Sequence, residues 1–196
     1  MRKWNDDPYT KKAKREDLLA RSFYKLEEID RRENLLSGAK LVIDLGASPG
    51  SWTQYCLKRI APQGRIIAVD LNPIKISDPR VSFVQTSIEL VDFALHLKAE
   101  KADVLLSDMA PNTSGIHDAD VARSCELADL ALSTASETLK KGGSFIVKLF
   151  MGESFEDYDA QLKKLFGTVH KLRPESTRKH SREIYFIAKR YLARAS

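Results

Sequence analysis

From residue 41 onward, short runs of β-branched and other apolar residues alternate with segments long enough to form helices. Because strands separated by helices form crossover units, this alternation predicts an α/β fold with a doubly wound, mostly parallel sheet covered on both faces. The predicted strands are 41–45, 65–70, 81–85, 102–107, 144–149, 168–172 and 183–188. Helices are expected at 52–60, 88–98, 120–140 and 155–166, from their length and apolar spacing.

The two ends of this pattern differ from its middle. Before the first strand, Leu18, Leu19, Phe23, Leu26 and Ile29 fall mostly at helical spacing, which predicts one leading amphipathic helix over 9–36. After it, only residues 173–182 separate the last two strands. So short a connection is typical of an antiparallel hairpin or a long loop, so we expect the sheet to end in an antiparallel strand.

A chain of 196 residues is long enough for one hydrophobic core and too short for two ordinary domains. It contains no internal repeat or linker, which predicts a single domain over 1–196, with a basic helical extension at 1–37 and a core at 38–190. No apolar run approaches the roughly 20 residues that span a bilayer, so we expect a cytoplasmic protein without a membrane partner. The two cysteines and four histidines lack metal-ligand spacing, and no metal is expected.

The net charge of +5 and the isoelectric point near 9.1 suggest a polyanionic partner. The distribution of the charge is more informative than its sum, because basic residues crowd one segment at each end of the chain. If the fold brings the two segments together, they form one phosphate-binding face; otherwise they are two solvated surfaces. The residues expected to bind such a partner are Lys11, Lys12, Lys14, Arg15, Arg21, Arg178, Lys179 and Arg182.

The first predicted strand runs through two glycines into a helix start, an arrangement that lets the backbone approach a nucleotide-like ligand. Asp70 ends the next strand, where a carboxylate can accept both hydroxyls of an adenosine ribose. The spacing Gly46-x-x-x-Gly50 lacks the third glycine of dinucleotide-binding loops, so a nucleoside without phosphates fits better than a pyrophosphate. A tight turn without a ligand and a dinucleotide-dependent oxidoreductase remain the alternatives.

Two further charged residues belong to later strands. Asp108 ends the strand 102–107 at the same edge as Gly46 and Asp70, although an aspartate there can also cap a turn. Lys148 lies within a strand of large apolar residues, where an ammonium group is costly unless a carboxylate pairs with it. A lysine–carboxylate cluster is therefore expected at this edge.

Six segments carry a more specific pattern. They are Arg21-Ser22-Phe23-Tyr24-Lys25-Leu26, Asp44-Leu45-Gly46-Ala47-Ser48-Pro49-Gly50-Ser51-Trp52, Val69-Asp70-Leu71, Ser107-Asp108-Met109-Ala110-Pro111-Asn112, Val147-Lys148-Leu149-Phe150 and Ser181-Arg182-Glu183. Together they resemble the FtsJ family of RNA ribose 2′-O-methyltransferases over nearly the whole chain. The resemblance implies a seven-stranded, Rossmann-like sheet whose last strand inserts antiparallel, and S-adenosylmethionine as cofactor.

The resemblance also implies the site. The family's Lys-Asp-Lys-Glu tetrad corresponds to Lys25, Asp108, Lys148 and Glu183. Where many members have an aspartate near the adenine, this chain has Ser87, a weaker acceptor for an exocyclic amine. The residues expected to bind the cofactor are Gly46, Gly50, Ser51, Trp52, Asp70, Leu71, Ser87 and Asp108.

Methyl transfer needs the acceptor oxygen in line behind the methyl carbon, so positioning dominates the catalysis. We expect Lys148 either to remove the 2′-hydroxyl proton or, as a cation, to stabilise the developing alkoxide, with Asp108 orienting it. The short chain most resembles the bacterial members that act on a uridine of 23S rRNA in the peptidyl-transferase region. We expect the protein to be a monomer whose partner is this RNA within the large ribosomal subunit. Methylation of tRNA anticodon loops, or a non-catalytic role in ribosome assembly, are the alternatives.

Overall fold

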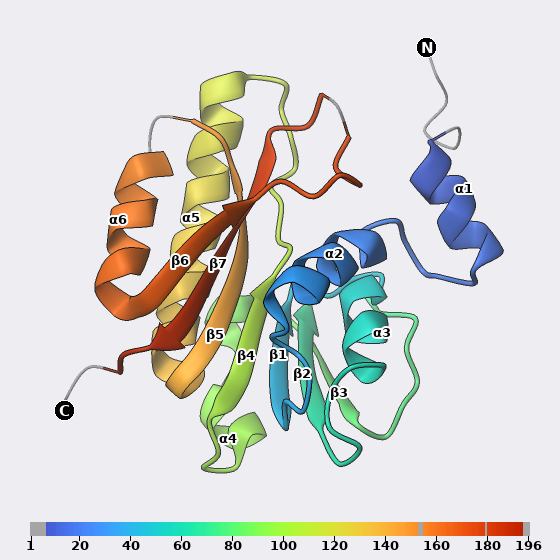
Figure 1. The fold of residues 1–196 in the computed structure, drawn as a ribbon, viewed down its shortest axis with the longest axis vertical. Helices are drawn as coiled ribbons and strands as arrows, with labels where there is room; N and C mark the ends of the chain where they lie inside the picture. Colours follow the sequence, from blue (N-terminus) through green and yellow to red (C-terminus); the bar gives the residue numbers. More distant parts are fainter. Residues whose placement is uncertain (1–6, 153–154, 179, 194–196) are drawn as a thin grey trace.

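The computed structural model describes residues 7–152, 155–178 and 180–193. Its seven strands form one sheet in the order β3-β2-β1-β4-β5-β7-β6 (Figure 1). Neighbours from β3 to β5 are parallel, and β7 is antiparallel to both β5 and β6, as the sequence predicts. The strands are β1 (Leu41–Leu45), β2 (Arg65–Asp70), β3 (Val81–Gln85), β4 (Ala102–Ser107), β5 (Leu139–Phe150), β6 (Phe166–Leu172) and β7 (Glu183–Tyr191).

The antiparallel strand β7 lies inside the sheet. The length of the last connection predicts an antiparallel strand at the end of the sheet, which would also allow β7 to be the edge strand. Four consecutive residues of β7, Tyr185 to Ala188, are fully buried, because both of its neighbours and both faces of the sheet cover them. The edge position goes to β6, whose residues are mostly exposed or half-buried. The amino end of β7, at Glu183, therefore lies beside Phe150 at the carboxyl end of β5.

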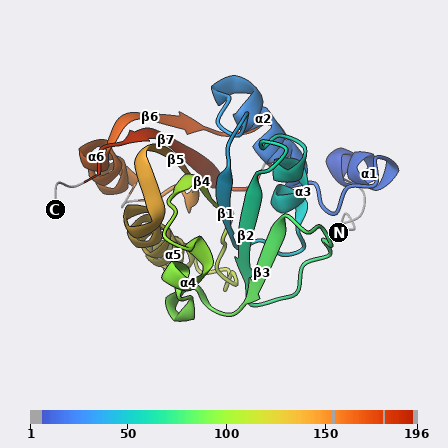
Figure 2. The same ribbon diagram turned by 90° about the horizontal axis from the view of Figure 1, so that it is seen from below.

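Helices cover both faces of the sheet, as Figure 2 shows from below. On one face, α4 (Phe93–Leu97), α5 (His117–Thr138) and α6 (Phe155–Leu165) contribute to a core that includes Leu105 and Phe186. On the other, α2 (Phe23–Glu33) and α3 (Ser51–Leu57) pack against Val42 and Ile146. With apolar layers on both sides, all five residues of β1 are buried, which explains why four of them are apolar and Asp44 is the exception.

The leading segment contains two helices, so the single helix expected over 9–36 is wrong. The first, α1 (Pro8–Arg15), begins where the Asp7 carboxylate accepts a hydrogen bond from the Thr10 amide at 3.1 Å. It ends before Asp17, whose φ of 54° breaks the helical path. Leu19 then crosses to α3, where its amide donates to Gln54 Oε1 at 3.2 Å. The apolar spacing that predicts one helix is thus shared by a helix and a connecting segment.

The region expected as a helix over 88–98 is also divided. It forms a short 3₁₀ helix, η2 (Ile88–Leu90), followed by α4, which the Asp92 carboxylate caps by accepting from the Leu95 amide at 3.2 Å. The strand expected at 144–149 is longer and begins at Leu139. The added residues of β5 lie at its amino end, whereas η2 follows the carboxyl end of β3.

Candidate active site

The carboxyl ends of four parallel strands bring the charged residues together. Gly46 follows β1, Asp70 ends β2, Asp108 follows β4 and Lys148 lies near the end of β5. Backbone bonds fix these turns: the Gly46 amide donates to Val69 O at 2.9 Å, and the Asp108 amide donates to Leu45 O at 3.2 Å. This edge is where open α/β sheets bind their ligands.

A cavity of about 490 Å³ lies at this edge. Its apolar wall is formed by residues such as Ile88, Met109 and Leu130, and its polar wall by carboxylates and loop backbone. Such a mixture suits a nucleoside, which has an apolar ring face and polar hydroxyls. Five of the eight residues expected to bind the cofactor line it: Gly46, Asp70, Leu71, Ser87 and Asp108.

The Asp70 carboxylate is held by the two loops beside it. Its Oδ2 accepts from the Ser48 amide at 2.9 Å, and its Oδ1 accepts from the Asn72 amide at 2.7 Å. These bonds join the glycine loop after β1 to the end of β2. The carboxylate is therefore oriented beside the cavity before any ligand binds.

The other three residues expected to touch the cofactor, Gly50, Ser51 and Trp52, do not border this cavity. Instead, Ser51 and Trp52 join α3 to the start of α2. Ser51 Oγ lies 2.6 Å from Ser22 Oγ, and Trp52 Nε1 donates to Ser22 O at 2.9 Å. A Cβ on Gly50 would lie 2.8 Å from the Ile76 side chain, so this glycine is needed for close packing. Their contacts hold the turn that precedes Lys25.

The four residues of the expected tetrad form two buried ion pairs. Lys148 Nζ donates to Asp108 O at 2.5 Å and to Asp108 Oδ1 at 3.0 Å. Lys25 Nζ, brought by α2, donates to Glu183 Oε2 at 2.6 Å. Lys25 and Lys148 are only 7% and 5% exposed, and each has the carboxylate partner that such burial requires.

Tyr185 links the two pairs and was not identified from the sequence. Its hydroxyl donates to Asp108 Oδ1 at 2.7 Å, while Lys25 Nζ lies 5.7 Å from the centre of its ring. The ring also packs against Trp52, at a centroid distance of 5.8 Å. Since side chains two residues apart on a strand share a face, its position after Glu183 is the signal that could have indicated it.

The charges around Asp108 determine its ionisation. Burial by itself raises the pKa of this carboxyl, but the positive charges of Lys148 and Lys25 and the hydrogen bonds from Tyr185 and Lys148 outweigh burial and hold the pKa below its usual range. Burial and the negative charges of Asp108 and Glu183 raise the pKa of the Tyr185 hydroxyl well above its usual value. At neutral pH the site therefore holds an ionised Asp108 and a neutral Tyr185.

Asp44, in β1 behind the glycine loop, is a second buried carboxyl. Its Oδ2 accepts from Thr53 Oγ1 at 2.7 Å, while its Oδ1 has no hydrogen-bond partner among the described residues. Burial, reinforced by the charges of Asp108 and Asp70 and opposed by the Thr53 bond, raises its pKa to about 7. Asp44 is thus protonated over much of the acidic range.

The two basic segments meet beside the tetrad. Arg21 donates to Ser176 O in the loop between β6 and β7, which joins the N-terminal segment to the C-terminal one. A cavity of about 250 Å³ is lined by Arg21, Lys25, Arg178 and Glu183, together with two serines. Lys11, Lys12, Lys14 and Arg15 are exposed on α1 and Arg182 is exposed near β7, whereas Lys179 lies outside the described residues.

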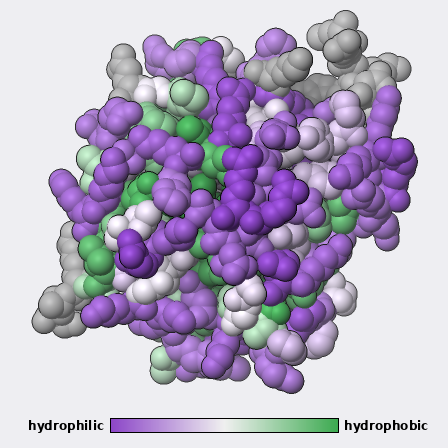
Figure 3. Space-filling model, in the orientation of Figure 1, coloured by the Kyte–Doolittle hydropathy of each residue, from purple (hydrophilic) through white to green (hydrophobic). Residues whose placement is uncertain are grey.

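Figure 3 shows hydrophilic side chains gathered over the side of the molecule where α1 lies. The sequence left open whether the two basic runs form one face or two, and the Arg21–Ser176 contact favours one. This face borders the end of the tetrad that contains Lys25 and Glu183.

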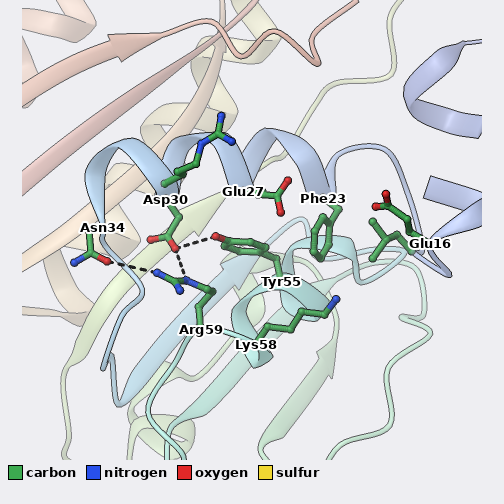
Figure 4. A pocket seen from close by; sticks show the side chains of 10 residues that line it. Glu16, Phe23, Glu27, Asp30, Asn34, Tyr55, Lys58 and Arg59 are labelled. Atoms are coloured by element: carbon green, nitrogen blue, oxygen red, sulfur yellow. Dashed lines mark hydrogen bonds and ion pairs between the residues drawn. The ribbon is translucent and has the colours of Figure 1, made fainter. Parts of the chain in front are cut away.

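A larger cavity, of about 640 Å³, lies between α2 and α3 and contains none of the tetrad. Its polar groups bind one another: the Asp30 carboxylate accepts from the Tyr55 hydroxyl at 3.0 Å and from Arg59 Nε at 2.9 Å (Figure 4). Asp30 also accepts from the Leu35 and Leu36 amides, so it fixes the end of α2. These contacts give this cavity a structural role.

Comparison with known proteins agrees with this geometry. A family model described as FtsJ-like methyltransferase matches residues 18–191. The chain belongs to the FtsJ-like methyltransferase family. It is therefore an enzyme that transfers a methyl group, as the motifs predict.

Relatives within the FtsJ-like methyltransferases cover nearly the whole chain. Proteins named ribosomal RNA large subunit methyltransferase E are 42% identical in Bdellovibrio bacteriovorus, over 92% of this chain and 94% of that protein, and 44% identical in Desulfatibacillum aliphaticivorans, over 94% and 89%. A crystal structure described as a ribosomal RNA methyltransferase from Plasmodium falciparum matches with a TM-score of 0.78 and 32% identity, over 89% of this chain and 99% of that one.

A structure described as an rRNA-methylase from Clostridium thermocellum, at 19% identity, matches with a TM-score of 0.54 over 85% of this chain and 97% of that one; it supports the fold alone. Across the described parts of this methyltransferase, no helix has the length and apolar character needed to cross a membrane. The same residues include no cluster of three His, Cys, Asp or Glu side chains that could hold a metal ion.

Proposed function

We propose that this methyltransferase transfers the methyl group of S-adenosylmethionine to a ribose 2′-hydroxyl of RNA, at a uridine of 23S rRNA in the peptidyl-transferase region. The observation that carries the proposal is the pair of buried ion pairs, Lys148–Asp108 and Lys25–Glu183, between the nucleoside-sized cavity and the basic face. A methyl donor and a polyanionic acceptor would meet at this place.

The cavity beside Asp70 fits S-adenosylmethionine in its chemistry. Asp70 offers two carboxylate oxygens to ribose hydroxyls, and the apolar wall offers a surface for the adenine ring. Asp108, held ionised, faces the same cavity and would favour the positive charge of the donor. Ser87 lines it where many members have an aspartate. When bound, S-adenosylmethionine supplies an electrophilic methyl group.

Lys148 would handle the proton of the acceptor hydroxyl. Two of its hydrogen-bonding positions are taken by the carbonyl and carboxylate of Asp108, which directs the remaining position of the amine. A neutral amine would present its lone pair there and act as general base, while an ammonium group would present an N–H and stabilise the developing alkoxide. Lys25, fixed by Glu183, would place the ribose.

The choice of ribosomal RNA rests on the relatives, which are named ribosomal RNA large subunit methyltransferase E and match most of this chain. The basic face formed by α1 and the β6–β7 loop supports an RNA substrate, whether ribosomal RNA or tRNA. Because all four tetrad residues come from one chain, we propose that the protein works as a monomer and a single domain, in the cytoplasm where ribosomal RNA is available.

Transfer of a labelled methyl group tests this function. Large ribosomal subunits from cells lacking the gene, and total tRNA from the same cells, would be incubated with the protein and S-adenosylmethionine, and 2′-O-methylation would be mapped. We expect one new methylated uridine in 23S rRNA. Methylation of tRNA alone would contradict the proposed substrate, and no transfer to any RNA would support the assembly-factor alternative.

The role of Lys148 is tested by the pH dependence of the single-turnover rate. General-base catalysis predicts an ionisation in the wild-type profile that disappears in Lys148→Ala. The variant rate should be lower by about 10²–10⁴-fold, the usual contribution of a positioned proton-transfer group. A wild-type profile without that ionisation would favour the ammonium form.

A further inference from the structure

The Arg21 guanidinium is held from two sides. One terminal nitrogen donates to Asp7 Oδ2 and the other to Ser176 O. The ring of Tyr9, on α1, lies 5.6 Å from the guanidinium carbon. Both partners of the ion pair are largely covered, with side-chain exposures of 14% for Arg21 and 22% for Asp7. Arg21 is therefore neutralised by a carboxylate from its own chain.

One partner of this ion pair, Arg21, lies beside the Lys25–Glu183 end of the tetrad. Arg21 borders the cavity of about 250 Å³ that also contacts Lys25, Glu183 and Arg178. Burial by itself raises the pKa of the Asp7 carboxyl. The hydrogen bonds from Thr10 and the charges of Arg21 and Arg178 outweigh burial and lower the pKa below its usual value. An ionised carboxylate thus lies within the field of two arginines, beside the proposed position of the target ribose.

The loop that Arg21 contacts carries a second sign of an incomplete arrangement. Ser176 and Thr177 are 2% and 8% exposed, and their hydroxyl oxygens have no hydrogen-bond partner among the described residues. Buried hydroxyl groups without partners are costly. The loop that accepts a hydrogen bond from Arg21 thus has two buried hydroxyls without a partner, directly before Arg178 in the chain.

We infer that Arg21 and Arg178 form a subsite for an RNA backbone phosphate next to the target ribose, and that Asp7 occupies it until RNA displaces the carboxylate. A guanidinium N–H donates to carboxylate and phosphate oxygens alike, so a phosphate would compete with Asp7 for the Arg21 nitrogen that now donates to it. The inference rests on the proposed RNA substrate. It goes beyond that proposal because it assigns to Asp7 the role of opposing RNA binding.

Displacement of Asp7 would also release the start of α1. That helix has eight residues, of which only Ala13 is buried, and Asp7 caps it through the Thr10 amide and hydroxyl. A helix so short is marginal on its own. In Figure 1 α1 stands apart from the sheet, at the margin of the fold. RNA binding would therefore exchange one ion pair and a small amount of helix packing for contacts with phosphate.

The variant Asp7→Asn tests the exchange, because asparagine caps a helix about as well as aspartate but carries no charge. With large ribosomal subunits from cells lacking the gene as substrate, we expect KM to fall by about two- to fivefold, which corresponds to the loss of one partly exposed ion pair. The kcat should stay unchanged, since Asp7 is not one of the residues proposed to contact the reacting atoms. Thermal unfolding of both proteins would verify the fold.

Glu16→Gln is the matched control, because it removes one negative charge from the same segment, where Glu16 contacts Tyr24 and Lys12 and not Arg21. Its KM should change by less than about twofold. In an Arg21→Gln background, Asp7→Asn should have no effect. A higher KM for Asp7→Asn, or a change equal to that of Glu16→Gln, would show that Asp7 merely positions Arg21 or the helix. If wild-type protein methylates no subunit, the proposed function fails instead.

Discussion

The hydroxyl of Tyr185 determines how Asp108 presents its carboxylate to Lys148. Removing it in Tyr185→Phe deletes the 2.7 Å bond to Asp108 Oδ1 and leaves the ring and its packing in place. Because that bond lowers the pKa of Asp108, the acid limb of the pH–rate profile should move to higher pH in the variant. At neutral pH we expect the single-turnover rate to fall about tenfold, the usual worth of a hydrogen bond to a charged group.

Tyr158→Phe is the matched control, because Tyr158 is also buried but its hydroxyl donates to Ala128 O at 2.8 Å, between α5 and α6. It should lose stability without moving the acid limb. If both variants give the same pH profile as the wild type, Tyr185 has only a packing role.

Asp44 makes the stability of the fold depend on pH. Its folded-state pKa of about 7 lies above the ordinary value of 3.8, so the folded protein holds this proton more tightly than the unfolded chain does. The resulting stability is present below about pH 4 and is lost as the pH rises through about 7. Asp44→Asn lacks this dependence.

Chemical unfolding of both proteins at several pH values measures the effect. Between pH 4.5 and 7.5, roughly, the unfolding free energy of Asp44→Asn should rise relative to that of the wild type by about 3 kcal/mol, at up to 1.36 kcal/mol for each pH unit. A constant difference over this range would mean that Asp44 is ionised throughout.

Apart from the glycine loop and the family resemblance, the sequence indicates residues of this site where polarity conflicts with its surroundings. Lys148 in an apolar strand requires a carboxylate, and Asp108 at a strand end supplies it. Tyr185 gives no such conflict, because tyrosine is common in buried strands. Asp7 is likewise unremarkable in sequence, since its contact with Arg21 depends on how α1 folds back.

At the level of elements, the glycine loop after β1 is fitted to the loop after β4. A Cβ on Gly46 would lie 2.8 Å from Met109 Cγ and 3.0 Å from the Met109 nitrogen. Met109 follows Asp108 directly, so Gly46→Ala should displace the carboxylate as well as strain the turn. We expect a loss of about 2–4 kcal/mol in unfolding free energy, from strain and overpacking together, and a lower transfer rate.

Gly38→Ala separates strain from contact. Gly38 has nearly the same φ, 75° against 74° for Gly46, but nothing lies within 4 Å of the added Cβ. This variant should lose only about 1 kcal/mol and keep the wild-type rate. Equal effects of the two substitutions on urea unfolding and on rate would contradict the proposed fit between the loops.

The inner strands of the sheet could be predicted because β1, β2, β4 and the second half of β5 are buried on both faces and are largely apolar. Four predicted strands, from β1 to β4, match the structure at both ends. The structure of the leading segment could not be predicted, because Leu18 and Leu19 lie in a connecting segment. They contact other elements there with an apolar spacing that a helix would also give. Apolar residues at helical spacing indicate which side chains are buried, and burial alone does not distinguish a helix from a connecting segment.

At the scale of the whole molecule, the charge of α1 lies at the catalytic edge and should act on RNA through phosphates. Lys14 and Arg15 are exposed on this helix, so Lys14→Ala with Arg15→Ala removes two cations without opening the core. The KM for large ribosomal subunits should rise and its logarithmic salt dependence should become shallower by about two, while kcat stays constant.

Lys98→Ala with Lys101→Ala removes the same charge from the opposite, amino-end edge of the strands, just before β4. If net charge alone attracted RNA, both double variants would weaken binding equally across a salt titration. If the α1 face is the contact, only the first pair changes the slope, because counterions are released only where cations meet phosphates. The difference between the two slopes, measured on the same subunit preparation, therefore locates the RNA on one edge of the sheet.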